Sequence, residues 1–88
     1  MQRRSMVINS KDNVAVLLEK ALHGDLIQAN GEDIVLRHDI DFGHKAAIRP
    51  LGTGDIVYKY GEEIGHMLEP VQAGGWIHNH NMGCRRGR

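Results

Sequence analysis

Apolar residues occur along the chain in short runs separated by turn residues, which is the pattern of a small all-β domain. The apolar run that starts at Leu26 is interrupted by Asn30-Gly31, a strong hairpin signal, and resumes at Ile34. A second run alternates through Ile56, Tyr58 and Tyr60, with a turn expected at residues 61–63. We therefore predict short strands joined by tight turns.

Four of these runs follow the same local pattern, in which an apolar residue, two variable residues and a glycine appear in order. The glycines are Gly24, Gly43, Gly54 and Gly74. Glycine adopts positive φ angles without the steric penalty that other residues meet. We predict that all four have positive φ, and that the apolar residue three places before each one is buried.

One segment has helical rather than strand periodicity. Between Asp12 and Gly24, positions 14, 17, 18, 21 and 22 are apolar, and Asp12 is a suitable N-cap. The opening residues Val-Ala-Val favour a strand instead. From the local pattern alone we predict a helix here.

Composition limits the classes of partner. The chain of 88 residues has 11 basic and 11 acidic residues, so charge gives no argument for binding nucleic acid or an anionic membrane. A single cysteine, Cys84, excludes an internal disulfide and favours a reducing compartment. No apolar run has the length of a signal peptide or membrane span, so we expect a cytoplasmic protein. The basic ends are expected to be solvated tails.

Four segments, in this order, resemble the small SAF-type domain of the altronate and galactarate dehydratase family. They are DNVAV (12–16), GHKAA (43–47), GDIVYKYGEEIG (54–65) and GGWIHNHN (74–81). The resemblance implies an all-β, β-clip fold like that of antifreeze-like domains, in which residues 14–18 form a strand rather than a helix. It divides the chain into a tail (1–6), the SAF-type domain (7–81) and a basic C-terminal tail (82–88).

The resemblance also implies a function. In this family the small domain works beside a much larger catalytic domain, often with iron(II). It is the N-terminal part of some sugar-acid dehydratases and a separate small subunit in others, such as (2R)-sulfolactate sulfo-lyase. We expect a lyase small subunit that removes water or sulfite from a sugar acid or related 2-hydroxy acid only with its large subunit. The alternatives are a piece of a longer dehydratase and a stand-alone ligand- or protein-binding module without catalytic activity.

Elimination next to a carboxylate requires a base, stabilisation of the enolate-like charge, and an acid or metal for the leaving group. On a strand, His78 and His80 would face the same side and could reach one cleft as proton carriers or metal ligands. Two histidines are an incomplete metal site, so a divalent metal, expected to be iron(II), would be shared with the large subunit. The alternative is a polar strand end without chemistry.

The GHK motif supplies the second pair of candidates. His44 is a candidate base or ligand, and Lys45 a candidate anchor for the substrate carboxylate; a solvated lysine beside a turn histidine explains the motif equally well. Trp76 and Tyr58 are expected in the core, whereas His38 and Cys84 are expected to have no special role. The further candidate substrate contacts are Asn13, Lys59, Tyr60, Asn79 and Asn81.

Overall fold

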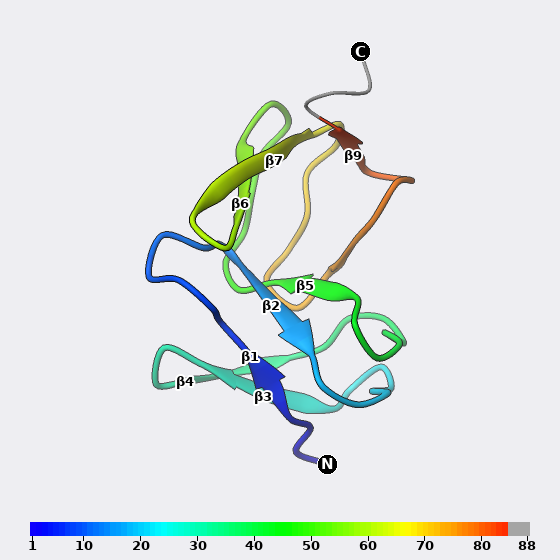
Figure 1. Cartoon of the computed structure of the whole chain (residues 1–88). Coiled ribbons are helices and arrows are strands. Elements are labelled where there is room, and N and C mark those ends of the chain that lie inside the picture. The colour runs from blue at the N-terminus through cyan, green and yellow to red at the C-terminus, as the bar shows by residue number, and fades with distance from the viewer. Residues whose placement is uncertain (85–88) are drawn as a thin grey trace.

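The computed structural model describes residues 1–84, which contain nine short strands joined by turns and loops (Figure 1). They are β1 (Ser5–Met6), β2 (Val14–Leu17), β3 (Leu26–Ala29), β4 (Glu32–Val35), β5 (Lys45–Ala47), β6 (Ile56–Lys59), β7 (Glu62–Met67), β8 (Trp76–Ile77) and β9 (Met82–Cys84). All pair antiparallel, in three sheets ordered β1-β2-β5-β8, β3-β4 and β6-β7-β9. The all-β prediction is confirmed. Within this range no helix is long and apolar enough to span a membrane.

The sheet β1-β2-β5-β8 separates two small apolar cores. Ala46 of β5 packs with Leu17 and Ile27 in the core beneath β3–β4. Its neighbour Ala47 belongs to the second core, with Val57 and residues of β7 and β9. Figure 1 shows β3–β4 on one side of β2 and β5, and β6, β7 and β9 on the other. Because adjacent residues of a strand point to opposite faces, β5 contributes to both cores.

The four repeated glycines have positive φ, as predicted, with values of 94° for Gly24, 83° for Gly43, 88° for Gly54 and 87° for Gly74. The apolar residue three places earlier is buried in three cases and half-buried at Val71, which packs against the second core. These apolar residues pair with one another in two isolated bridges, Ala21 with Ile40 and Leu51 with Val71. The four glycine turns are therefore arranged as two equivalent pairs, and one β-bridge joins the two turns of each pair.

The hairpins β3–β4 and β6–β7 are entered through the same hydrogen-bonded turn. Asp25 Oδ2 accepts the backbone N–H of Leu22 at 2.9 Å, and Asp55 Oδ2 accepts that of Gly52 at 2.7 Å. The two hairpin tips also match, with positive φ at both Asn30-Gly31 and Tyr60-Gly61. This geometry is typical of two-residue hairpin turns. The two hairpins are copies of one structural unit.

The predicted hairpin at Asn30-Gly31 is confirmed, but the second turn lies at Tyr60-Gly61 rather than at residues 61–63. The β6–β7 register shifts between Val57 and Tyr58. Val57 is fully buried, whereas Tyr58 is only half-buried, so the residue that β6 gives to the core is Val57 rather than the expected Tyr58. A bulge changes which residues face the core, and alternation alone cannot reveal it.

The helix predicted from local periodicity is wrong, and the strand implied by the family resemblance is observed. Val14–Leu17 is β2, paired with β1 on one side and β5 on the other. Its residues contribute to both cores, so an uninterrupted apolar run is expected of this strand. Asp12 does not cap a helix; its carboxylate accepts the backbone N–H groups of Tyr60 and Gly61 at 3.0 and 2.8 Å.

Strands occur in parts of both segments that were expected to be solvated tails. Arg3 Nε donates to Asp25 Oδ2 at 2.8 Å, and this bond is the largest of the interactions that lower the pKa of Asp25 to about 2. β1 falls inside the expected tail 1–6, and β9 falls inside the expected tail 82–88. Cys84 is consequently an exposed residue of β9 rather than part of a tail. Residues 85–88 lie outside the described range.

Candidate functional site

The segment that follows β8 is a turn rather than a continuing strand. Asn81 donates its backbone N–H to the carbonyl of His78 at 3.0 Å. Its buried side chain closes the turn, because Oδ1 accepts the His78 N–H and Nδ2 donates to the Trp76 carbonyl, both at 2.9 Å. The expectation that His78 and His80 share one face of a strand is therefore wrong. A turn held by Asn81 positions the two imidazoles instead.

Four rings from two distant motifs form an aromatic cluster, defined as His44, Trp76, His78 and His80. The His78 ring stacks on the Trp76 ring, with centroids 5.3 Å apart and planes at 12°, and His80 lies 4.8 Å from the same ring. His44 stacks on His78 at 4.9 Å. Pairing of β5 with β8 thus brings the GHK and HNH motifs together.

Trp76 connects this cluster to His38. Its indole N–H donates to Nδ1 of His44 at 3.3 Å, and its backbone N–H donates to Nδ1 of His38 at 3.2 Å. A neutral imidazole that accepts at Nδ1 carries its proton on Nε2, so each histidine presents an Nε2–H donor. Trp76 does pack against the core beneath β3–β4, as expected, but it also orients two histidines.

Electrostatics favours an unprotonated His78. Partial burial lowers its pKa, and repulsion from His44, Lys45 and His80 in their protonated forms lowers it further. Burial and the charge of Lys59 likewise lower the pKa of half-buried Lys45, with Cys84 acting in the opposite direction. Among residues 1–84, no carboxylate forms a salt bridge with Lys45. The cluster therefore combines a neutral imidazole with an uncompensated positive charge nearby.

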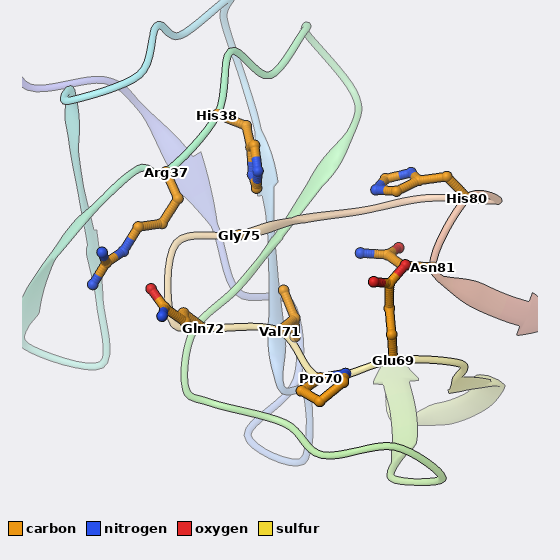
Figure 2. A pocket seen from close by; sticks show the side chains of 9 residues that line it. All are labelled: Arg37, His38, Glu69, Pro70, Val71, Gln72, Gly75, His80 and Asn81. Atoms are coloured by element: carbon orange, nitrogen blue, oxygen red, sulfur yellow. The ribbon is translucent and has the colours of Figure 1, made fainter.

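A pocket of about 390 Å³ lies beside the cluster (Figure 2). Its lining residues are Arg37, His38, Glu69, Pro70, Val71, Gln72, Gly75, His80 and Asn81. Two of these, His80 and Asn81, were sequence candidates. His38 and Glu69 lie in ordinary polar connections, so no local sequence signal marks them as site residues. Only the return of the chain after β4 and after β7 brings them to His80.

The other predicted substrate contacts lie in different settings. Asn13 is buried, and its amide donates to the Ile56 carbonyl at 2.8 Å and accepts the Tyr58 N–H at 2.9 Å, which fixes β6. Lys59 lies with Nζ 5.0 Å from the ring centroid of Tyr60, at an exposed hairpin tip. Asn79 is exposed in the turn after β8. Substrate contact by these residues stays a prediction.

Within residues 1–84 the histidines do not form a complete metal site. In the described part of the sequence, no three His, Cys, Asp or Glu side chains converge closely enough to hold an ion. Two imidazoles supply half of a tetrahedral set at most. The metal expected from the resemblance would need ligands from outside residues 1–84.

Comparison with known proteins agrees with the fold. The family model described as the altronate/galactarate dehydratase SAF domain matches residues 3–85. The chain is 38% identical over 74 residues to altronate dehydratase of Escherichia coli, and 36% identical over 74 residues to altronate dehydratase of Bacillus subtilis. Each alignment covers 84% of this chain but only 15% of the relative.

A second group of relatives is shorter. The chain is 42% identical over 53 residues to the (2R)-sulfolactate sulfo-lyase subunit alpha of Paracoccus pantotrophus. This alignment covers 60% of the chain and 79% of that subunit. The same domain therefore occurs within long dehydratases and in a short subunit whose name denotes a multi-subunit enzyme.

Proposed function

The chain belongs to the altronate/galactarate dehydratase SAF domain family, and on this premise we propose that it is the small subunit, or N-terminal domain, of a lyase. It acts on a sugar acid or related 2-hydroxy acid and is inactive without a large catalytic subunit. The altronate dehydratases it resembles are several times its length, and the sulfo-lyase relatives are named as subunits. Location in the cytoplasm stays part of this proposal.

The observation that carries the proposal is the aromatic cluster. The chain places three imidazoles around one indole at the ends of β5 and β8, next to a lysine without an acidic partner among residues 1–84. A domain that only packs against a neighbour gains nothing from such a concentration of proton-transfer groups. An 88-residue chain with two thin cores is also too small to enclose a polyhydroxy acid by itself.

The residues fit the steps of an elimination. Neutral His78 accepts the proton from C2 of the acid, and the electron pair of the C–H bond forms the C2–C3 double bond. The C3 hydroxyl leaves with a proton as water, and the resulting enol becomes the 2-keto-3-deoxy acid. Nε2–H of His44 is a donor for the developing charge, and Lys45 attracts the carboxylate. For a sulfonated substrate the C3–S bond breaks and sulfite leaves.

The divalent metal, expected to be iron(II), belongs to the proposal only in the complete enzyme. One nitrogen of His78 cannot both bind the metal and accept the C2 proton, so the two roles are alternatives. As ligands, His78 and His80 would contribute no more than two, and the large subunit the others. Iron analysis of the purified complex provides the check. If the His78→Ala/His80→Ala variant kept the iron content of the wild type, these histidines would not be ligands.

The test is reconstitution with a large subunit of the dehydratase family from the same organism, with iron(II) and with altronate or (2R)-sulfolactate. We expect turnover only when both subunits are present. His78→Ala/His80→Ala should reduce kcat/KM by at least ~100-fold, the usual size of a general acid–base contribution. His23→Ala, which removes an exposed histidine outside the cluster, is the matched control.

Two outcomes would contradict the proposal. Unchanged turnover of the double variant would remove the cluster from the chemistry. Failure of the chain to bind the large subunit or to alter its activity would favour the stand-alone binding module.

A further inference from the structure

The pocket beside the aromatic cluster is built from equivalent segments of the two hairpin units. One segment follows β4 and runs from Leu36 to the bridge residue Ile40. The other begins at Met67, the last residue of β7, and runs to the bridge residue Val71. Leu36 N–H donates to the carbonyl of Asp25, and Met67 N–H to that of Asp55, each at 2.8 Å. His38 follows the donor Leu36 by the same number of residues as Glu69 follows the donor Met67. His38 and Glu69 are therefore at equivalent positions of the two hairpin units.

The two hairpin units carry different side chains at this position, so one side of the pocket is lined by His38 and another by Glu69. His38 presents an Nε2–H donor, because its Nδ1 accepts the Trp76 N–H. Glu69 is an acceptor when ionised. Figure 2 shows His38, His80 and Glu69 pointing toward the space above Val71 and Gly75, whereas Arg37 points away. Donors and an acceptor therefore surround an apolar floor made by Val71 and Pro70.

This combination suits a hydroxylated carbon chain better than an anion. Each hydroxyl both donates and accepts, so it can bond an imidazole N–H and a carboxylate at once. The C–H groups between hydroxyls match the apolar floor. A second carboxylate would instead meet the charge of Glu69. The volume of about 390 Å³ is in the range of small-molecule sites.

We propose that this pocket, through Glu69 and His38, binds the polyhydroxylated end of the substrate, beyond the carbons that react. The inference rests on the proposed function. His80 belongs to both the aromatic cluster and the pocket lining, so the two sites are continuous. Elimination occupies C1 to C3 at the cluster, and every further carbon must lie next to it. A three-carbon acid has no atoms left for the pocket.

The experiment compares altronate, which has six carbons, with (2R)-sulfolactate, which has three, in the reconstituted complex. Glu69→Gln removes a charged acceptor from an exposed position and is not expected to disturb folding. We expect it to raise KM for altronate by about tenfold or more, as the loss of a hydrogen bond to a charged group does, with little change in kcat. Glu63→Gln, an equally exposed glutamate on β7 outside the pocket, is the matched control.

Other patterns would overturn the inference. An unchanged KM for altronate would exclude contact with Glu69. Equal losses with both acids would indicate that the pocket holds a side chain of the large subunit. A wild-type complex that turns over sulfolactate but not altronate would sink the inference and leave the proposed function intact.

A binding measurement separates this inference from the proposed function. The chain alone, labelled with ¹⁵N, is titrated with altronate while the Trp76 amide signal is followed, since its N–H bonds to His38. A shift in the wild type and in Glu63→Gln, but not in Glu69→Gln, supports the pocket even if no complex is active. No shift in the wild type, together with no altronate turnover, overturns it.

Discussion

The indole N–H of Trp76 donates a hydrogen bond to Nδ1 of His44, at 3.3 Å, across 32 positions of sequence. Through this bond Trp76 of β8 determines which ring nitrogen of His44, next to β5, carries the proton. A neutral histidine whose proton is held on Nε2 always donates from that nitrogen, whereas a mixture of tautomers donates from it only part of the time. Trp76 is accordingly a positioning residue for the cluster.

Trp76→Phe tests this relationship, because phenylalanine keeps an aromatic ring but has no N–H group. The free energy of unfolding should fall by about 1–2 kcal/mol, and the nitrogen NMR signals of His44 should change from a single Nε2–H tautomer to a mixture. In the reconstituted complex kcat should fall while KM changes little. An unchanged His44 spectrum would show that the indole does not set the tautomer.

The pH behaviour of His78 follows from its lowered pKa. Its NMR titration midpoint should lie below the ordinary value of 6.5, and Lys45→Gln should raise it by removing a neighbouring positive charge. Because the folded pKa is the lower one, the unfolded chain takes up the proton first, and stability is lost as pH falls below about 6.5. Urea unfolding from pH 8 to pH 5 measures this. A midpoint at or above 6.5 would contradict the assigned environment.

The acid range depends on a different residue. Asp25 has a pKa of about 2 instead of 3.8, chiefly because Arg3 donates to it. Its contribution to stability is present above pH 3.8 and is lost as pH falls toward 2. Arg3→Gln should therefore raise the pKa of Asp25 and flatten stability in this window, as followed by carboxyl NMR and by unfolding. Arg4→Gln, which contacts Glu19, should leave the Asp25 titration nearly unchanged.

Two glycines with the same conformation should respond very differently to substitution. Gly43 and Gly74 have φ of 83° and 87°. An added Cβ meets no atom within 4 Å at Gly43, whereas at Gly74 it overlaps the carbonyl oxygen of Val35. Gly43→Ala should cost about 1–2 kcal/mol, the strain of the left-handed conformation. Gly74→Ala should cost at least ~3 kcal/mol more or prevent folding, as shown by thermal unfolding. Equal costs would mean that β4 moves away freely.

Asn13 was a candidate substrate contact, and its buried amide bonds the backbone of β6 on both sides. Asn13→Ala leaves the Ile56 carbonyl and the Tyr58 N–H unpaired, which should lower the free energy of unfolding by about 2–3 kcal/mol. If Asn13 acts only by holding β6, KM of the complex should stay within about twofold. A large rise in KM without loss of stability would support the predicted substrate contact instead.

Much of the fold followed from local sequence. Glycine adopts positive φ more readily than any other residue, whatever the rest of the chain does, so Gly24, Gly43, Gly54 and Gly74 could be identified from their pattern alone. The hairpin at Asn30-Gly31 is local in the same sense. Residues 14–17 could not be assigned this way, because a strand buried on both faces shows no alternation.

Most residues of the candidate site could likewise be predicted from local sequence, but their arrangement could not. The GHK and HNH motifs are visible in the sequence, so His44, Lys45, His78 and His80 could be named as candidates. Their arrangement could not, since the turn held by Asn81 and the pairing of β5 with β8 exist only in the folded chain. His38 and Glu69 lie in ordinary polar connections, and nothing local distinguishes them. Long-range strand pairing places them in one pocket, and that pairing depends on contacts between residues far apart in the chain.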